Sequence, residues 1–343
     1  MIARYYAVLI SICSAQAWAE QTLEIKVSTF NQLQGWSIDV HNAVLSVFVQ
    51  TCPDLKSQDW QTLCAIAQHT KDGKTFFESF FKPVLISDGS DPLFTGYYEP
   101  ELIVSRVKTA KYQFPIYRAP NDLPKSGKWF TRQQIVEDKI LSNRGLEIAW
   151  ASDPVDVFFL QIQGSGRLRF TDGSSLRIGY GGSNGHKYRS VGKEMVRRGI
   201  YDEHQVSATV IKNWVSRNPN DGRALLNHNP SFVFFRELDV SLHKGPLGAM
   251  NRSLTPMRSV AIDPKYIPLG AAVWLDKAGQ SPMRRLMIAQ DTGSVIKGAQ
   301  RADIFIGSGD NAGREAAKIK DKGSIYVLLP IKRALSLISQ ARQ

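Results

Sequence analysis

The sequence predicts a mainly β protein of two domains that also contains several helices. Its 343 residues exceed the needs of one small core and suit two domains of roughly 100–200 residues each. Short strand-like segments separated by Gly and Pro follow residue 245, a pattern that favours a compact barrel. Charged and apolar residues alternate around Asp172-Gly173, which predicts a β-hairpin in the middle of the chain.

Residues 1–19 have the pattern of a secretory signal peptide. Arg4 precedes an apolar run, and Ala17-Trp18-Ala19 is a small-x-small cleavage site. The run is far shorter than the ~20 residues that a bilayer-spanning helix needs. We therefore expect an exported, periplasmic protein. A lipid anchor at Cys13, with outer-membrane association, stays open as the alternative to cleavage after Ala19.

The two cysteines beyond this segment, Cys52 and Cys64, form either a disulfide or a pair of buried thiols, because an exported chain allows both. Their spacing matches no zinc motif, and the six histidines show no paired-ligand spacing. We expect neither a metal nor another cofactor.

The formal net charge of +12 is compatible with nucleic acid, anionic lipid or an anionic polymer such as a cell wall, and a solvated basic surface is the default interpretation. Lys and Arg are spread along the chain without a run of five, and no nucleic-acid-binding motif is present. We expect no nucleic-acid partner.

Residues 20–100 mix helical and turn-rich segments. Apolar periodicity predicts helices over residues 40–49 and 61–69. Residues 92–100 are rich in Pro, Gly and aromatic residues, and we interpret them as a turn-rich domain boundary.

Residues 101–244 have mainly a strand pattern. The β-branched and aromatic run Val155–Gln163 predicts a strand closed by Gly164-Ser165-Gly166, and two further strands flank the hairpin turn. A capping-box pattern at Thr131–Gln134 begins a helix to about Leu141, and residues 207–217 predict another.

The last part of the chain, residues 245–343, predicts five short strands and one helix. The strands are expected at residues 258–262, 271–275, 286–290, 303–306 and 325–329, and the helix at 311–319.

A serine nucleophile is one alternative for the chemistry. Residues 181–185 (GGSNG) match the G-x-S-x-G pattern with Ser183 as the nucleophile. The preceding strand alternates charged with apolar residues, whereas a nucleophile elbow follows a strand buried on both faces. A serine hydrolase is therefore the weaker interpretation.

Three aspartates beside predicted strand ends are more informative, since Asp is a poor strand former. They are Asp263, Asp291 and Asp303. Asp263 precedes Pro264, where capping a turn is an equal explanation. Asp303 is flanked by Ala302 and the apolar run 304–306, surroundings that raise the pKa of a carboxyl group. A carboxyl group that stays protonated can act as a general acid on a glycosidic oxygen.

Several motifs in a fixed order resemble the membrane-bound lytic murein transglycosylase A (MltA) family. They are residues 95–100 (TGYYEP), 114–118 (FPIYR), 159–166 (FLQIQGSG), 180–192 (YGGSNGHKYRSVG) and the segment 255–309. The last segment resembles a three-aspartate (3D) domain, whose aspartates fall at Asp263, Asp291 and Asp303.

This resemblance implies a double-psi β-barrel domain formed by residues 20–100 and 245–343, with a second β-domain, residues 101–244, inserted. Glycan strands of peptidoglycan are then the partner and lie in the groove between the domains. The family's D-x-aromatic-x-G stretch falls at residues 303–307, so the resemblance makes Asp303 the single acid/base. The implied reaction cleaves the β-1,4 bond between N-acetylmuramic acid and N-acetylglucosamine without water and leaves a 1,6-anhydromuramic end.

Asp291 and Asp263 are expected to support Asp303 by positioning it or by tuning its pKa. Uncharged polar groups and aromatic rings suit sugar hydroxyls, amides and pyranose faces. The predicted substrate-binding residues are Tyr97, Tyr98, Gln161, Gln163, Ser165, Tyr180, Asn184 and Lys297.

Two other functions stay open on the sequence. One is a hydrolytic muramidase in which Glu99 or Asp291 activates water beside Asp303. The other is a non-catalytic protein whose basic surface binds peptidoglycan.

Overall fold

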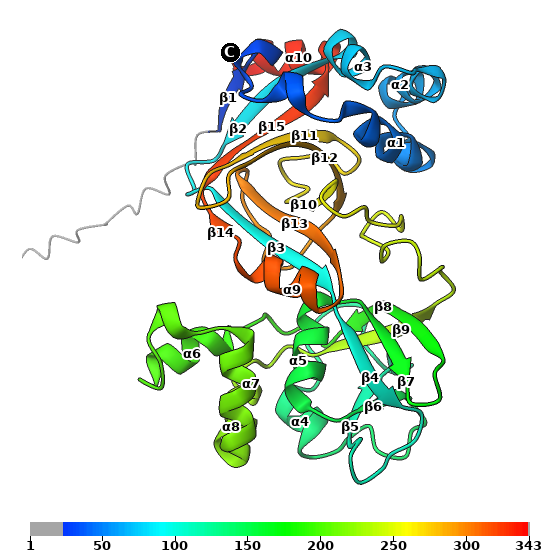
Figure 1. Ribbon diagram of the computed structural model, residues 1–343, viewed down its shortest axis with the longest axis vertical. Coiled ribbons are helices and arrows are strands. Elements are labelled where there is room, and N and C mark those ends of the chain that lie inside the picture. Colours follow the sequence, from blue (N-terminus) through cyan, green and yellow to red (C-terminus); the bar gives the residue numbers. More distant parts are fainter. Residues whose placement is uncertain (1–22, 342–343) are drawn as a thin grey trace, which may run out of the picture.

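The computed structural model describes residues 23–341, and the predicted signal peptide with Cys13 lies outside them. Within this range the strands form a nine-stranded and a six-stranded sheet. Figure 1 shows the larger sheet curling like a barrel in one half of the molecule and the smaller sheet in the other. The predicted mainly β fold with several helices is confirmed, and the double-psi topology stays an expectation.

The larger sheet has the order β1-β2-β15-β11-β12-β10-β13-β3-β14. Neighbouring strands are antiparallel except β10 with β12 and β13 with β3, which are parallel. The strands are β1 (Glu24–Val27), β2 (Phe81–Ser87), β3 (Leu93–Glu99), β10 (Ser259–Ala261), β11 (Ala272–Lys277), β12 (Met283–Asp291), β13 (Arg301–Ser308), β14 (Lys320–Asp321) and β15 (Gly323–Pro330).

Helices from both ends of the chain accompany this sheet (Figure 1). They are α1 (His41–Thr51), α2 (Gln58–His69), α3 (Gly73–Phe80), α9 (Gly309–Ala317) and α10 (Ile331–Ala341). Phe48 of α1 and Phe76 of α3 share one buried core with Trp274 of β11.

A disulfide joins Cys52, directly after α1, to Cys64 in α2, which settles the alternative left open by the sequence. Closing a loop of this length stabilises a fold by ~3 kcal/mol.

The smaller sheet has the order β5-β6-β4-β7-β8-β9. Its strands are β4 (Glu101–Ser105), β5 (Phe114–Tyr117), β6 (Glu147–Ala151), β7 (Gly166–Phe170), β8 (Ser175–Ser183) and β9 (Val233–Leu238). The predicted hairpin at Asp172-Gly173 joins β7 to β8. Helices α4 (Arg132–Val136), α5 (Pro154–Gln163), α6 (Val191–Arg197), α7 (Ala208–Arg217) and α8 (Pro219–Asn227) complete this half. No helix between residues 23 and 341 is long and apolar enough to cross a bilayer.

Two predictions of secondary structure were wrong. Val155–Gln163 is not a strand but most of helix α5, because Asp153 caps its first turn, Pro154 begins it, and Gly164 ends it in a left-handed conformation at φ 74°. Residues 92–100 are not turn-rich but contain β3, a strand inside the larger sheet that ends at Glu99. Both segments carry residues of the candidate site.

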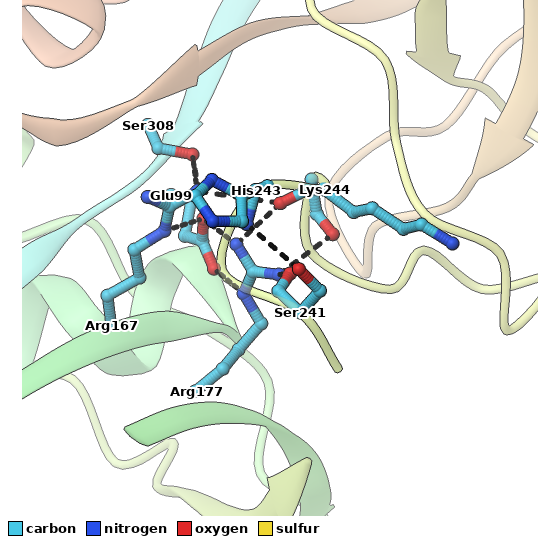
Figure 2. Close-up of polar contacts among 8 residues, drawn as sticks. Glu99, Arg167, Arg177, Ser241, His243, Lys244 and Ser308 are labelled. Carbon is cyan, nitrogen blue, oxygen red and sulfur yellow. Dashed lines mark hydrogen bonds and ion pairs between the residues drawn. The ribbon is translucent and has the colours of Figure 1, made fainter. Parts of the chain in front are cut away.

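The chain passes from the larger to the smaller sheet at Glu99, and a buried ion cluster holds this crossing. The Glu99 carboxylate is fully buried and accepts hydrogen bonds from Arg177 (2.7 and 3.1 Å), Arg167 (2.8 Å) and the Ser308 hydroxyl (2.7 Å). Arg177 also donates to the Ser241 and Lys244 carbonyls on the segment that returns to the larger sheet. Figure 2 shows these groups converging on Glu99. We propose the domain division 20–100 and 245–343 against 101–244 on the basis of this double crossing.

Replacing Glu99 by Gln is expected to destabilise the protein by about 3 kcal/mol or more, because Arg177 then stays buried without a counter-charge. The matched control is Glu101→Gln, whose partner Arg169 is 64% exposed, and we expect it to cost less than about 1 kcal/mol. Urea unfolding measures both free energies. Equal small losses would show that the buried cluster contributes no more than a surface pair.

Candidate active site

Register brings Asp303 and Asp291 into one row across the larger sheet. Asp303 of β13 lies opposite Thr95 of β3 on one side and Ala261 of β10 on the other, and Ala261 lies opposite Asp291 of β12. Residues that pair across strands share a face, so these side chains project from the same side of the sheet. A β-bulge next to Ala261 shifts the register of β10 against β12 and sets Asp291, not Gln290, in the row.

The carboxyl group of Asp303 is partly buried and is held by a hydrogen-bonded chain. Thr95 Oγ1 donates to Asp303 Oδ1 at 2.5 Å. Arg301 Nη2 in turn donates to Thr95 Oγ1 at 2.8 Å. Because the threonine oxygen accepts from the guanidinium, its own hydrogen is directed at the carboxyl group. The Thr95 hydroxyl thus holds the Asp303 carboxyl group directly, and the Arg301 guanidinium holds Thr95.

Asp291 is held by three donors. Its Oδ2 accepts from the Tyr97 hydroxyl at 2.7 Å, and its Oδ1 accepts from the backbone N–H groups of Ala249 and Thr292, each at 2.9 Å. Asp291 therefore ties the segment around Ala249 to the barrel. The hydrogen bonds of the described residues include none between Asp291 and Asp303, so the expected support acts through charge rather than through a direct bond.

Both carboxyl groups have raised pKa values. Burial raises the pKa of Asp303 and the nearby Asp291 charge raises it further, while the Thr95 hydrogen bond and the Arg301 charge lower it in part. Burial also raises the pKa of Asp291 against the lowering effect of its three donors. Burial and the Asp291 charge hold the pKa of Tyr97 well above its usual range, so Tyr97 stays a donor.

A cavity of about 490 Å³ opens beside this row, between the two halves of the molecule. Its walls come from α5 and the β8–β9 pair on one side and from β3, β12 and the segment after Leu247 on the other. Six residues predicted from the sequence line it, namely Tyr97, Gln161, Gln163, Ser165, Tyr180 and Asp291. Asp303 is not in the lining and shares the sheet face with Tyr97 and Asp291, which are.

Four predicted residues lie elsewhere. Asn184 was expected to bind substrate but is fully buried, with its amide satisfied by the Phe130 and Pro230 carbonyls and the Phe232 N–H, so that prediction was wrong. The Tyr98 ring packs against Gly313 of α9, on the opposite face of β3 from Tyr97. Neither residue lines the cavity.

Asp263 and Lys297 form a separate turn. Asp263 is buried and accepts from the Lys265 and Gly298 N–H groups, and the exposed Lys297 ammonium lies 3.9 Å from it. Among the described residues, no hydrogen bond or ion pair joins Asp263 to Asp303, so the predicted support is not seen. The alternative prediction, that Asp263 caps a turn, agrees with the structure. Lys297 pairs with Asp263 instead of lining the cavity.

Sequence reasoning missed Thr95, Arg301 and Arg236. Thr95 was part of a quoted motif but was assigned to a turn, and a strand assignment would have placed it on the face of Tyr97. Arg301 stands two residues before Asp303, the spacing of same-face neighbours in a strand. Arg236 lines the cavity from β9 and had no signal in the sequence.

The structure does not support two of the alternative catalytic residues, Glu99 as the base of a muramidase and Ser183 as a nucleophile. Glu99 cannot activate water, because its carboxylate is fully buried and occupied by two arginines and a serine. Ser183 ends β8 inside the sheet, paired with Val233, rather than lying on a sharp turn from strand to helix. Among residues 23–341, no group of three or more His, Cys, Asp or Glu side chains is arranged to hold a metal ion.

Two family models match the chain. The MltA specific insert domain matches residues 93–236, and the 3D domain matches residues 258–329. A relative, the membrane-bound lytic murein transglycosylase A of Escherichia coli (strain K12), is 37% identical over 245 residues, which are 68% of this chain and 65% of that protein. The alignment thus spans slightly less than two thirds of that relative.

Solved structures match over more of the chain. The crystal structure of MltA from Neisseria gonorrhoeae is 34% identical, with a TM-score of 0.78, and the match covers 90% of this chain and 93% of that one. The crystal structure of E. coli MltA with bound chitohexaose is 27% identical, with a TM-score of 0.71, and covers 85% and 90%. With this identity over nearly a whole relative, and with both domain patterns in order, the chain belongs to the MltA family.

Proposed function

We propose that this protein is a lytic transglycosylase that cleaves the β-1,4 bond between N-acetylmuramic acid and N-acetylglucosamine in peptidoglycan. The observation that carries the proposal is the partly buried Asp303 carboxyl group, whose pKa is raised by burial, on the sheet face that borders the cavity between the two halves. The polar side chains of that cavity suit a glycan, and the E. coli relative has been crystallised with bound chitohexaose.

In the proposed reaction Asp303 first acts as the acid. Its proton passes to the oxygen that links the two sugars while the bond from C1 of muramic acid to that oxygen breaks, which frees the 4-hydroxyl of N-acetylglucosamine. The oxygen of the C6 hydroxyl of the same muramic acid then bonds to the electron-poor C1. The C6 hydroxyl proton passes to the Asp303 carboxylate, so the acid is restored and no water is consumed.

One carboxyl group is enough for this reaction, because the nucleophile belongs to the substrate. A hydrolytic glycosidase needs a second carboxylate to activate water or to attack C1. Holding the C6 hydroxyl near C1 makes the attack intramolecular, and orientation of this kind lowers a barrier by several kcal/mol. The burial of Glu99 in its arginine cluster removes one of the two bases that the muramidase could use. Asp291, the other, lines the cavity but accepts hydrogen bonds at both carboxylate oxygens, which favours the transglycosylase.

The neighbours of Asp303 receive positioning roles in this proposal. Thr95 and Arg301 fix the orientation of the carboxyl group, and the charge of Asp291 helps to keep it protonated. Tyr97 holds Asp291, and the polar groups of Gln163, Ser165 and Tyr180 face the glycan. We also propose export to the periplasm with peptidoglycan glycan strands as the partner, in keeping with relatives named as membrane-bound murein enzymes.

Asp303→Asn is expected to lower turnover of purified murein sacculi by at least about 100-fold, because the amide keeps the shape but has no acidic proton to give. The control is Asp276→Asn, which removes a carboxylate from a surface pair with Arg284 in the same barrel and should keep full activity. Mass spectrometry of the released muropeptides should find 1,6-anhydromuramic ends. Reducing muramic ends would favour the muramidase, and sacculus binding without release would favour a wall-binding protein.

The stability of Asp303→Asn separates lost chemistry from lost folding. A folded pKa above the unfolded value means that the ionised carboxylate makes the folded state less stable as the pH rises through that folded pKa. The Asn variant should therefore be at least as stable as the parent at high pH, with the difference disappearing in acid.

Thr95→Val should move the alkaline limb of the pH–kcat/KM profile to higher pH. The Thr95 hydrogen bond lowers the pKa of Asp303, so its loss raises that pKa, and the acid form persists further into alkali. The maximal rate should fall, because the carboxyl group loses its orienting donor. Thr95→Ser keeps the hydroxyl and should restore both the limb and the rate. A lower rate with an unshifted alkaline limb would show that Thr95 contributes only packing and does not act on the pKa of Asp303.

A further inference from the structure

A second cavity, of about 430 Å³, lies within the inserted half of the molecule. It is walled by β5, α4, α5 and the α7–α8 pair. Among the described residues, Gln161 alone lines both this cavity and the catalytic cavity. Its volume falls in the usual range of small-molecule sites. The proposed transglycosylase reaction gives this second cavity no role.

Most of its wall is apolar. Aromatic and aliphatic side chains line it from every surrounding element, among them Phe114, Ile135, Val157, Leu226 and Phe232. Such a wall favours a ligand with an apolar body, since the transfer of apolar surface out of water is favourable.

The polar end of the cavity is a buried arginine. Arg132 lines the cavity and is 5% exposed. Its Nε donates to the Asn229 carbonyl at 3.1 Å, and its Nη2 donates to the Gln161 side chain and to the Ser231 carbonyl, each at 2.6 Å. Within the described part of the chain, Nη1 has no hydrogen-bond partner, and no carboxylate is paired with the guanidinium.

The charge of Arg132 is therefore buried without an anion. Its guanidinium stacks on Phe158 at 4.7 Å and on Phe232 at 5.2 Å from the ring centroids. Burial lowers its pKa to about 9, which is the expected effect of a cation that carbonyls and rings solvate but no counter-charge neutralises. A bound anion would relieve this deficit.

Two further cations stand in the lining. Lys139 and Arg223 are exposed, and neither side chain forms an ion pair or hydrogen bond with any described residue. The acidic residue of the lining is Asp153, which accepts from the Val155 N–H and lies 3.5 Å from the Lys212 ammonium. Asp156 binds the same ammonium at 2.6 and 2.8 Å, so Lys212 is shared by two carboxylates.

Glu137 lies near this rim but outside the lining, where its carboxylate accepts from Asn227 and Gln133. The lining thus carries three cations and one carboxylate, and this excess of positive charge favours an anion inside the cavity.

We infer that this cavity binds an organic carboxylate with an apolar body: the carboxylate pairs with Arg132, the rim cations Lys139 and Arg223 attract its charge, and the apolar part packs against the aromatic and aliphatic walls. A planar guanidinium with two free N–H groups matches a carboxylate better than a neutral ligand. Because Arg132 donates to Gln161, the occupant would contact a residue pair that reaches the wall of the catalytic cavity.

A ligand with a carboxylate and an apolar body can come from two sources, a fatty acid or the acidic peptide of murein. Isothermal titration of the whole protein with octanoate, with 1-octanol and with a free murein tetrapeptide separates them. The test variant is Lys139→Ala with Arg223→Ala, two exposed changes that leave the core intact. The charge-matched control is Lys187→Ala with Arg189→Ala, exposed cations of the same half that do not line the cavity.

Octanoate or the tetrapeptide should bind at one site, and the test variant should weaken that binding about tenfold while the control leaves it unchanged. Octanol should bind at least about tenfold more weakly than octanoate, because it lacks the charge that Arg132 recognises. Tighter binding of octanoate identifies the acyl chain as the source, and tighter binding of the tetrapeptide identifies the peptide.

Three results would overturn the inference. They are no binding of either carboxylate, binding that the test variant does not weaken, and octanol binding as tightly as octanoate. Arg132→Gln adds a second check if it folds, since it should lower octanoate affinity without affecting octanol. These are binding measurements, so a failure of the proposed catalytic activity leaves them interpretable.

Discussion

The proposed chemistry depends on a carboxyl group that is partly withdrawn from water on the face of a β-barrel. Asp303 is flanked in sequence by residues that point into the main core, Ala302 and Ile304, and this packing fixes which face its side chain occupies. Burial raises its pKa, and a threonine that is itself held by Arg301 orients it. The side chains of Arg301, Thr95 and Asp303 are therefore linked by two successive hydrogen bonds. A carboxyl group in this setting can give a proton and take one back.

The second requirement is a fixed relation between the two halves of the molecule, since both line the catalytic cavity. Glu99, at the first crossing of the chain, provides this fixed relation. It accepts from Arg177, which also binds the returning segment, and from Ser308 at the end of β13, the strand that carries Asp303. Such a cluster contributes little net stability over an apolar one, but removing a single partner is costly. Its role is to hold one arrangement of β3, β13 and the inserted sheet. The Asp303 carboxyl group and the side chains that line the candidate cavity are thereby kept in a fixed relation.

Local pattern predicted much of this fold, and cross-strand geometry was the part it could not supply. The strands around Asp291 and Asp303, the hairpin at Asp172-Gly173 and helix α7 follow from local signals and are confirmed. Helix α5 was missed because it is apolar on most sides, buried between sheet and helices, so its residues resemble a strand; the cap at Asp153 was the available signal. Asn184 looked like a sugar-binding residue because composition cannot tell a buried amide from an exposed one. The pairing of Thr95 with Asp303 spans 208 residues and arises only when β3 and β13 lie side by side.

The most direct test of the account is a ¹³C NMR titration of the Asp303 carboxyl carbon, assigned by the resonance that disappears in Asp303→Asn. We predict that this carboxyl group titrates at a clearly higher pH than solvent-exposed aspartates do, and that Thr95→Val moves it higher still. Titration of Asp303 at or below the range of exposed aspartates would contradict it. The side chain would then be an ordinary carboxylate at neutral pH, with no proton to give to a glycosidic oxygen.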